Sequence, residues 1–429
     1  MKYYSTNGKA PIASFREAVF KGLPEDNGLY MPEKVPSLLP SFFDALQDLS
    51  LPEIGYQVLK PFVGEEIPNN KLEDILHNTL NFEIPLVRVS GDVYSLELFH
   101  GPTFAFKDVG ARFLARSLSY FSEQTDQKLK VLVATSGDTG SAVAQGFYDV
   151  PNIEVLILYP SGKISHFQEQ QMTTLGKNIN ALEVSGTFDD CQNMVKQAFL
   201  DKELSRSINL TSANSINIAR LLPQSIYYFY GLAQLPKEKQ AQVVISVPSG
   251  NYGNLTAGLI AQRMNVPIHH FLACSNINDT VPEYLRTAEY KAKPGIQTIS
   301  NAMDVGDPSN FRRILDLFSG SYQQMASHIS GYSFNDEQTR AAIHKVHEET
   351  DYILDPHGAV GYLGLKDYLE KNGGTGIFLE TAHPYKFKET VESEIEKKIT
   401  PVLSFDERKK KSLPFSSDFE DLKSYLQKQ

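Results

Sequence analysis

The residue whose surroundings most favour chemistry is a lysine in an aromatic turn. Lys107 ends the run FHGPTFAFK and is followed by Asp108 and Val109. Burial lowers the pKa of a lysine because its charged form loses hydration. A neutral lysine amine is the nucleophile that forms a Schiff base with an aldehyde. The alternative is a solvated lysine beside Asp108, and this lysine alone leaves both interpretations open.

A glycine-rich loop provides a second candidate site. Residues 249–254 read SGNYGN and lie between a predicted strand (242–247) and a predicted helix (255–264). Glycine lets the backbone approach a ligand closely, and the N–H groups at a helix start bind anions. We expect Gly253 to stand where a side chain would block that approach. The loop matches neither the Walker A nor the dinucleotide fingerprint, so it predicts a site for one phosphate or a plain turn.

Two more strand-to-helix loops carry clustered polar groups. Residues 134–140 read ATSGDTG, and residues 212–220 read SANSINIAR. Hydroxyl and N–H groups at a helix N-terminus suit a carboxylate or phosphate, and Arg220 binds phosphate as a planar fork. Each loop alone is equally typical of an ordinary capped helix, because Ser, Thr, Asp and Asn are the preferred N-cap residues.

Other kinds of site find little support. His344 and His347 lie in a charged helical segment without an H-E-x-x-H motif, which favours a solvated helix face over a metal site. No G-x-S-x-G elbow is present. Cys191 and Cys274 lie far apart in the sequence, which fits a reducing compartment and excludes a disulfide framework. We expect no metal.

Composition narrows the class of protein. The chain has 429 residues, enough for two or three domains, and its 41% hydrophobic and 21% charged residues are ordinary for a soluble globular protein. A net charge of −10 argues against nucleic acid as the main partner. The N-terminus lacks a signal-peptide pattern, and no apolar run reaches 18 residues. We expect a cytoplasmic protein that does not associate with membranes.

The elements that must position these loops alternate between strands and helices. Strands are predicted at 130–134, 153–159, 181–184, 242–247, 270–274 and 377–379, and helices at 140–148, 165–175, 188–200 and 255–264. Continuous apolar strands between helices predict an α/β fold with two doubly wound parallel-sheet domains and a ligand cleft between them. We expect three segments: a mostly helical N-terminal extension (1–83), a small α/β domain (84–225) and a large α/β domain with a C-terminal tail (226–429).

Taken together, these motifs identify a protein family more specifically than any one of them does alone. HGPTFAFKDVGARFLA (100–115) closely resembles the pyridoxal-lysine segment of threonine synthases. Residues 134–140, 212–220 and 246–258 also resemble that family, as do NAMDV (301–305) and LETAHP (379–384). The resemblance runs nearly from end to end and fits the long bacterial and fungal form. It implies a fold type II enzyme with pyridoxal 5'-phosphate in the interdomain cleft.

The resemblance also implies a role for each matching residue. Lys107 would bind the cofactor covalently, and Thr381 would meet its pyridine nitrogen. The cofactor phosphate would be held by Gly250, Asn251, Tyr252, Gly253 and Asn254. The substrate carboxylate would be held by Thr135, Ser136, Asp138 and Thr139, and the substrate phosphate by Asn214, Ser215 and Arg220. Many enzymes of the wider fold have Asn where this chain has Asp138. Because two carboxylates repel, we expect the backbone N–H of Asp138 to make the contact.

The function implied by the resemblance is the conversion of O-phospho-L-homoserine and water into L-threonine and phosphate. The cofactor acts as an electron sink, phosphate leaves the γ-carbon, and water adds at the β-carbon. One alternative is a phospholyase on the same scaffold that releases an α-keto acid from phosphohomoserine or phosphothreonine. Another is a non-catalytic metabolite-binding protein, against which the intact Lys107 and Gly-Asn loop argue. The expected assembly is a monomer or a homodimer.

Overall fold

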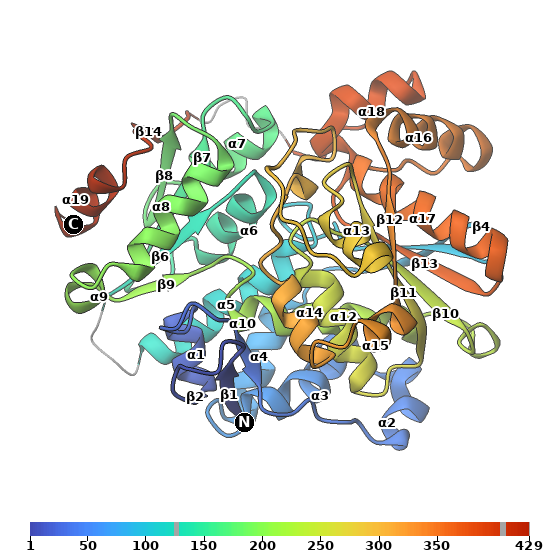
Figure 1. The fold of residues 1–429 in the computed structure, drawn as a ribbon, viewed down its shortest axis with the longest axis horizontal. Helices are drawn as coiled ribbons and strands as arrows, with labels where there is room; N and C mark the ends of the chain where they lie inside the picture. Colours follow the sequence, from blue (N-terminus) through green and yellow to red (C-terminus); the bar gives the residue numbers. More distant parts are fainter. Residues whose placement is uncertain (124–127, 404–408, 429) are drawn as a thin grey trace.

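The computed structural model describes residues 1–123, 128–403 and 409–428 and contains three sheets with helices packed around them. A six-stranded and a five-stranded sheet lie side by side, with the N-terminal region against both of them (Figure 1). This arrangement confirms the predicted α/β fold with two parallel-sheet domains. Within the described ranges, no helix combines the length and apolarity that a membrane span requires.

The larger sheet has the strand order β12-β11-β10-β13-β5-β4. Its central strands, β10 and β13, are buried along their whole length, as expected for a sheet covered on both faces. Neighbouring strands run parallel except β4 and β5, which form an antiparallel pair. The strands are β4 (Leu86–Ser90), β5 (Val93–Glu97), β10 (Val243–Pro248), β11 (Ile268–Ser275), β12 (Ile329–Ser333) and β13 (Thr375–Glu380).

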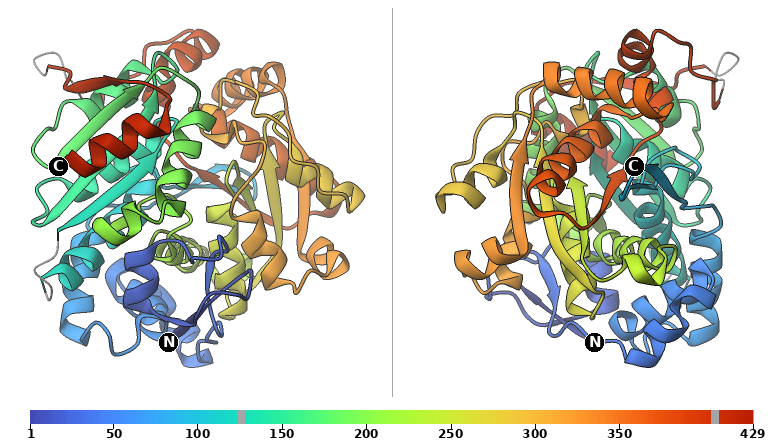
Figure 2. Two further views of the ribbon diagram at one scale, coloured as in Figure 1. Left: turned by 60° about the vertical axis from the view of Figure 1, so that its left-hand side comes forward. Right: turned by 90° about the vertical axis from the view of Figure 1, so that its right-hand side faces the viewer.

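The smaller sheet is parallel throughout, in the order β14-β8-β7-β6-β9. The C-terminal helix α19 (Phe419–Lys428) lies on the side of the molecule that holds the smaller sheet, where it packs against α8 (Phe188–Leu200) (Figure 2). Leu422 and Leu426 of that helix join the apolar cluster that includes Leu182 of β8. The strands are β6 (Leu129–Ala134), β7 (Ile153–Pro160), β8 (Ile179–Val184), β9 (Leu210–Ser212) and β14 (Ser412–Phe415).

The sheets do not follow the three contiguous segments that we expected. β4 and β5 lie within 84–225 yet belong to the larger sheet, because β5 pairs with β13 and β4 pairs with β5. β14 lies within 226–429 yet pairs with β8 of the smaller sheet. The reason is that parallel neighbours can come from any part of a chain, whereas a segment boundary inferred from sequence assumes local pairing. Of the basic run at 408–411, Arg408 lies outside the described residues. Lys410 is exposed and forms ion pairs with Glu169 and Glu183 at 2.7 Å.

The N-terminal region contains the expected helices and also a small antiparallel sheet, β2-β1-β3. Its strands have two to four residues, too few for a sequence period to reveal them. The carbonyl oxygen of Val19 accepts hydrogen bonds of 3.0 Å from Thr211 Oγ1 and Asn217 Nδ2. This contact fixes the N-terminal region against the 212–220 loop. The elements are β1 (Lys2–Ser5), β2 (Ala13–Ser14), β3 (Tyr30–Pro32), α1 (Phe15–Lys21), α2 (Pro40–Ala45), α3 (Leu51–Val63) and α4 (Asn69–Thr79).

The remaining helices cover the two large sheets, and several of them begin where the loops discussed below end. On the side of the smaller sheet they are α5 (Lys107–Ser122), α6 (Asp138–Phe147), α7 (His166–Thr173), α8 (Phe188–Leu200), α9 (Leu204–Ser207) and α10 (Ile218–Leu221). Around the larger sheet they are α11 (Ile226–Ala233), α12 (Gly253–Arg263), α13 (Thr280–Thr287), α14 (Phe311–Leu317), α15 (Tyr322–His328), α16 (Asp336–Thr350), α17 (Pro356–Asn372) and α18 (Lys388–Ile395).

Candidate active site

A pocket between the two large sheets brings together every site residue that the sequence predicted. The loops after β6, β9, β10 and β13 all open into it, because the carboxyl ends of parallel strands are where such loops gather. Its lining includes Lys107, Thr135, Ser136, Asp138, Thr139, Asn214, Ser215, Arg220, Gly250, Asn251, Tyr252, Gly253, Asn254 and Thr381.

Lys107 is the first residue of α5 and is held from both sides of its turn. The N–H of Phe106 donates to the carbonyl oxygen of Thr381 at 2.9 Å, and Tyr227 Oη donates to the carbonyl oxygen of Phe106. Behind the turn, Asp108 accepts from the N–H and Oγ1 of Thr103, at 2.9 and 2.6 Å. The turn is therefore rigid, and its lysine is directed into the pocket lining.

The amine of Lys107 is easily deprotonated. Burial lowers the pKa of Lys107 to about 8, against the opposing effect of Asp138, and the positive charges of Lys386 and Arg220 lower it further. At that pKa about a tenth of the amine is neutral at pH 7, against about three in ten thousand for an ordinary lysine. A neutral amine in a pocket is a nucleophile and a proton acceptor.

The carboxylate of Asp138 is engaged within the protein. Its Oδ1 lies 2.6 Å from Lys386 Nζ and accepts a 2.9 Å hydrogen bond from Gln168 Nε2. Its Oδ2 lies 4.0 Å from Lys107 Nζ. Burial raises the pKa of Asp138, but Lys386 and Lys107 outweigh that effect and hold the pKa well below its usual range. The side chain is thus an anion with its own cations, which agrees with the expectation that only its backbone N–H faces a substrate carboxylate.

The glycine-rich loop leads into α12, whose first N–H groups have no partner within the helix. Tyr252, the N-cap, has a φ of 59°, and its ring is buried with Oη 2.6 Å from Ser275 Oγ. Only the backbone of Tyr252 therefore faces the pocket. The position without room is Gly250, where a Cβ would lie 2.6 Å from the carbonyl oxygen of Ala302.

Gly253 has no comparable constraint from the protein itself, and its role in the approach to a ligand stays a prediction. Its φ is not in the left-handed region, which Tyr252 occupies instead. A Cβ at Gly253 would meet its nearest neighbours at 3.5 Å, an ordinary van der Waals distance. The strained residue of the loop and the crowded one are therefore both on the N-terminal side of Gly253, where the chain leaves β10 and turns into the helix.

Ser215 joins the 212–220 loop to the glycine-rich loop. Its Oγ accepts hydrogen bonds from Asn251 Nδ2 at 3.1 Å and from Asn310 Nδ2 at 2.9 Å. A hydroxyl has two acceptor lone pairs and one donor, so these bonds leave the O–H of Ser215 to donate to a ligand. Arg313, fully buried, donates to the carbonyl oxygen of Ser215 at 3.0 Å and fixes the loop from behind.

Thr135 has the same arrangement in the loop after β6. Its Oγ1 accepts from the N–H groups of Gly137 and Gly140, at 2.9 and 2.8 Å. Both lone pairs are thereby used, and the O–H remains as a donor. Ser136 and Thr139 line the pocket on either side of this turn. The loop therefore presents hydroxyl donors at the N-terminus of α6, which suits an anion.

Arg220 and Asn214, both in the 212–220 loop, differ in their hydrogen-bond partners. Arg220 is 3% exposed; its Nη1 donates to the carbonyl oxygen of Ala213, and its buried Nε has no hydrogen-bond partner. Burial lowers the pKa of Arg220 to about 10, so the guanidinium is still charged at neutral pH. The amide of Asn214 instead pairs with the backbone of Ala134, donating at 2.8 Å and accepting at 3.2 Å. Arg220 therefore adds a further spare donor in this loop to the O–H of Ser215.

The sequence analysis missed several residues of the pocket. His357 lines it, with Nδ1 2.5 Å from Asp355 Oδ1 and Nε2 accepting a 3.2 Å hydrogen bond from the N–H of Ala302. The Asp-Pro-His run opening a helix was the available signal, since Asp before Pro is a typical helix start. The other lining residues that we did not predict include Phe188, Gln192, Gln224, Met303 and Val305.

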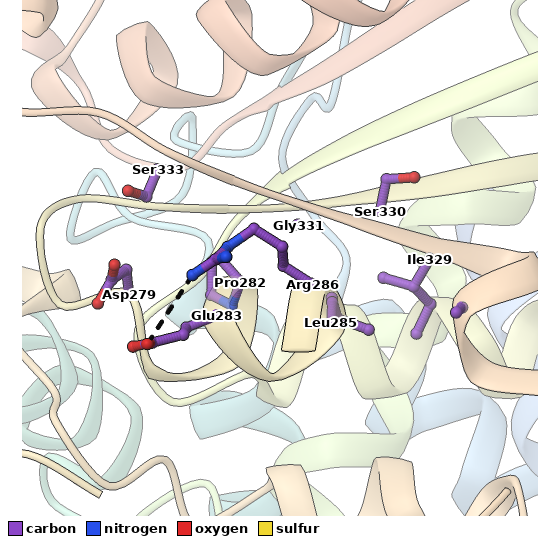
Figure 3. A pocket seen from close by; sticks show the side chains of 10 residues that line it. Asp279, Pro282, Glu283, Leu285, Arg286, Ile329, Ser330, Gly331 and Ser333 are labelled. Carbon is purple, nitrogen blue, oxygen red and sulfur yellow. Dashed lines mark ion pairs between the residues drawn. The ribbon is translucent and has the colours of Figure 1, made fainter. Parts of the chain in front are cut away.

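A second hollow lies away from these residues, between α13 and β12 (Figure 3). Its charged pair, Arg286 and Glu283, is 3.9 Å apart, and the Arg286 side chain is 74% exposed. None of the predicted site residues lines it. An exposed ion pair contributes little free energy and does not hold a side chain in one orientation toward a ligand. The pocket between the two large sheets is therefore the candidate active site.

The pocket residues fit a phosphorylated aldehyde cofactor. A deprotonatable amine, Lys107, lies in one pocket with the free N–H groups at the start of α12. Asn254 Nδ2 and Arg220 Nε are buried donors without partners there, so the site offers more donors than the protein itself uses.

Comparison with known proteins agrees with this geometry. The family "Threonine synthase N terminus" matches residues 2–80, and the family "Pyridoxal-phosphate dependent enzyme" matches residues 82–376. Threonine synthase from Haemophilus influenzae is 46% identical, over 100% of both chains. Threonine synthase from Saccharomyces cerevisiae is 36% identical, over 91% of this chain and 88% of the yeast one.

Solved structures agree as well. The crystal structure of threonine synthase from Escherichia coli superposes with a TM-score of 0.94 and 42% identity, covering 100% of both chains. A threonine synthase from Brucella melitensis with pyridoxal phosphate bound has a TM-score of 0.91 and 33% identity, covering 100% of this chain and 99% of the other. The chain therefore belongs to the threonine synthase family of pyridoxal-phosphate-dependent enzymes.

Proposed function

We propose that this protein converts O-phospho-L-homoserine and water into L-threonine and inorganic phosphate. The observation that carries the proposal is the position of Lys107: a buried amine with a pKa of about 8 shares one pocket with two groups of anion-binding donors. A substrate with a carboxylate at one end and a phosphate at the other needs such donors on both sides of the reacting carbons.

Lys107 would hold the cofactor covalently, and the backbone N–H groups of residues 250–254 would hold its phosphate. Thr381 lines the pocket beside the Lys107 turn and would meet the pyridine nitrogen with its hydroxyl. A hydroxyl does not force a proton onto that nitrogen as a carboxylate would. When bound, pyridoxal phosphate supplies an electron sink for carbanions at the substrate carbons.

The substrate would lie between the other two loops. The hydroxyls of Thr135, Ser136 and Thr139, with the backbone N–H of Asp138, would bind its carboxylate at the N-terminus of α6. The O–H of Ser215 and the guanidinium of Arg220, which both line the pocket, would bind its phosphate. Charge-assisted bonds of this kind are about twice as strong as neutral ones, so Arg220 would both select the substrate and stabilise the phosphate as it leaves.

Once the substrate has displaced it, the Lys107 amine is free beside the substrate α-carbon. As a base it would remove the α-proton and then a β-proton, which allows phosphate to leave the γ-carbon. One of the two removed protons would then return to the γ-carbon, which becomes the methyl group. Water adds its hydroxyl at the β-carbon and its remaining proton goes to the phosphate, and Lys107 returns the other proton to the α-carbon. A positioned proton transfer contributes about 100- to 10,000-fold in rate, and a pKa near the working pH suits a group that must both take and give protons.

The test is product analysis with the purified protein. We expect phosphohomoserine to give threonine and phosphate in a 1:1 ratio, with the absorbance of bound pyridoxal phosphate in the protein. Phosphate with an α-keto acid in place of threonine would identify a phospholyase. Binding of phosphohomoserine without release of phosphate would identify a metabolite-binding protein. A protein that binds no pyridoxal phosphate would contradict the proposal at its first step.

A further inference from the structure

Two lysines meet one buried carboxylate. Lys386 Nζ lies 2.6 Å from Asp138 Oδ1, and Lys107 Nζ lies 4.0 Å from Oδ2 of the same side chain. Lys386 belongs to the 3₁₀ helix Pro384–Phe387 that follows β13, and its side chain has no exposed surface. It also donates to the carbonyl oxygen of Thr103 at 2.9 Å, in the turn that carries Lys107.

The two lysines have different surroundings. Lys107 lines the pocket, whereas Lys386 lies behind it and is not part of the lining. The ammonium of Lys386 is satisfied by Asp138 and Thr103, so it is not available to a ligand. If Lys386 lost its charge, the buried carboxylate would keep one nearby cation, Lys107. A carboxylate within about 4–6 Å favours the charged form of an amine.

We infer that Lys386 is a positioning residue for Lys107: its ammonium occupies the Asp138 carboxylate and thereby leaves the Lys107 amine free to lose its proton. The inference rests on the proposed role of Lys107 as the cofactor lysine. It also gives a reason for Asp138 itself. An aspartate at this point would by itself hold Lys107 protonated, and Lys386 removes that effect while the ion pair anchors the Lys107 turn through Thr103.

The charges that face Lys107 come from three elements. They are Asp138 of α6, Lys386 of the 3₁₀ helix after β13, and Arg220 of α10. The next residue, Asp108, is turned to Thr103. Burial is the largest influence on the pKa of Lys107; Asp138 raises that pKa, and Lys386 and Arg220 lower it. The pKa therefore agrees with the geometry: one anion is offset by two cations.

The reactivity of Lys107 in the full-length, cofactor-free protein tests the inference without requiring turnover. The probe is acetic anhydride, and the readout is the acetylated fraction of the Lys107 peptide by mass spectrometry across a pH series. The wild type should reach half-maximal reactivity near pH 8. In Lys386→Met that midpoint should rise by about one pH unit or more, which lowers reactivity at pH 7 about tenfold.

Two further variants separate charge from packing. Asp138→Asn should lower the midpoint, because it removes the anion and leaves both cations. The double variant Asp138→Asn/Lys386→Met should bring the midpoint back to the wild-type value or below it. A merely structural Lys386 would not produce this reversal, because the double variant removes the same packing. In the cofactor-loaded enzyme, the acid limb of the kcat profile should move in the same directions.

Two results would overturn the inference. One is an unchanged midpoint in a Lys386→Met protein whose Tm shows that it is folded, and the other is a raised midpoint that the second substitution fails to reverse. If Lys386→Met does not fold, Asp138→Asn decides, because a midpoint at or above the wild-type value contradicts the proposed balance of charges. If the midpoints shifted as expected but the wild-type enzyme formed no threonine, the result would count against the proposed function and not against this inference.

Discussion

The N–H of Phe106 donates a 2.9 Å hydrogen bond to the carbonyl oxygen of Thr381. The two segments continue to pair on either side: Ala105 forms a bridge with Ala382, and the N–H of His383 donates to the carbonyl oxygen of Phe104 at 3.0 Å. The lysine turn and the end of β13 are therefore one unit. Whatever fixes Thr381 also fixes Lys107, although the two come from distant parts of the sequence.

Replacing Lys107 tests its role directly. Lys107→Ala should lower threonine formation by at least about 1000-fold, because both the covalent hold on the cofactor and the positioned base are lost. Borohydride reduction followed by mass spectrometry should find cofactor attached to the Lys107 peptide in the wild type and none in the variant. The exposed Lys371→Ala serves as the control and should behave like wild type. Normal activity in Lys107→Ala would assign the chemistry to another residue.

The glycine-rich loop allows a matched pair of substitutions. Gly250→Ala places a methyl group 2.6 Å from the Ala302 carbonyl oxygen, so the loop must shift, and both Tm and pyridoxal-phosphate affinity should fall. At Gly253 the same methyl group meets nothing closer than 3.5 Å, and Gly253→Ala should keep a Tm near wild type. Thermal unfolding and cofactor titration of the apoprotein give the two readouts. Equal losses of Tm in both variants would show that close packing against Ala302 does not fix the loop.

Replacing Arg220 tests which of the two proposed phosphate sites this residue serves. Arg220→Ala should lower kcat/KM for phosphohomoserine about 10- to 200-fold, the effect of losing charge-assisted bonds of about 1.5–3 kcal/mol. Cofactor occupancy should stay near wild type, because the N–H groups of α12 need no cation. Arg220→Lys should recover only part of the loss, since an ammonium cannot reproduce the planar fork. Loss of cofactor with normal kinetics in the loaded fraction would mean that Arg220 serves the cofactor phosphate.

Glu380, at the end of β13, gives a prediction for pH. Burial raises the pKa of Glu380 well above its usual range, and the neighbouring Asp355 raises it further. Between the unfolded value of about 4.5 and this higher folded value, the folded state binds more protons, so the free energy of unfolding falls as pH rises. Glu380→Gln cannot ionise, and its amide oxygen can still accept the hydrogen bond from the N–H of Asp355. The difference in Tm between Glu380→Gln and the wild type should therefore be larger, in favour of the variant, at pH 8 than at pH 5. An identical difference at the two pH values would contradict a protonated Glu380.

The sequence by itself determined the α/β fold, the strands that carry the site and the loops that form it. The buried strands β6, β10 and β13 each contain a short apolar run (131–134, 243–245 and 377–379), and each strand is followed at once by its polar loop. A loop's position at a strand end is encoded locally, but each motif alone left alternatives open, and Lys107, Ser215 and Arg220 were assigned to one site by the resemblance of the motifs together to the threonine synthase family. All of them line one pocket.

The tertiary structure alone decided which of these groups are free. Asp138 was predicted from its loop, but its partner Lys386 comes from the 3₁₀ helix after β13, far away in the sequence, and nothing local marks the pair. The same is true of His357 against Ala302, and of β4 and β5, which join the larger sheet. Electrostatic and hydrogen-bond partners are chosen by distance in space, and burial strengthens their effect because water no longer screens them. The sequence therefore names the groups that do the chemistry, and packing sets their charge and their free donors.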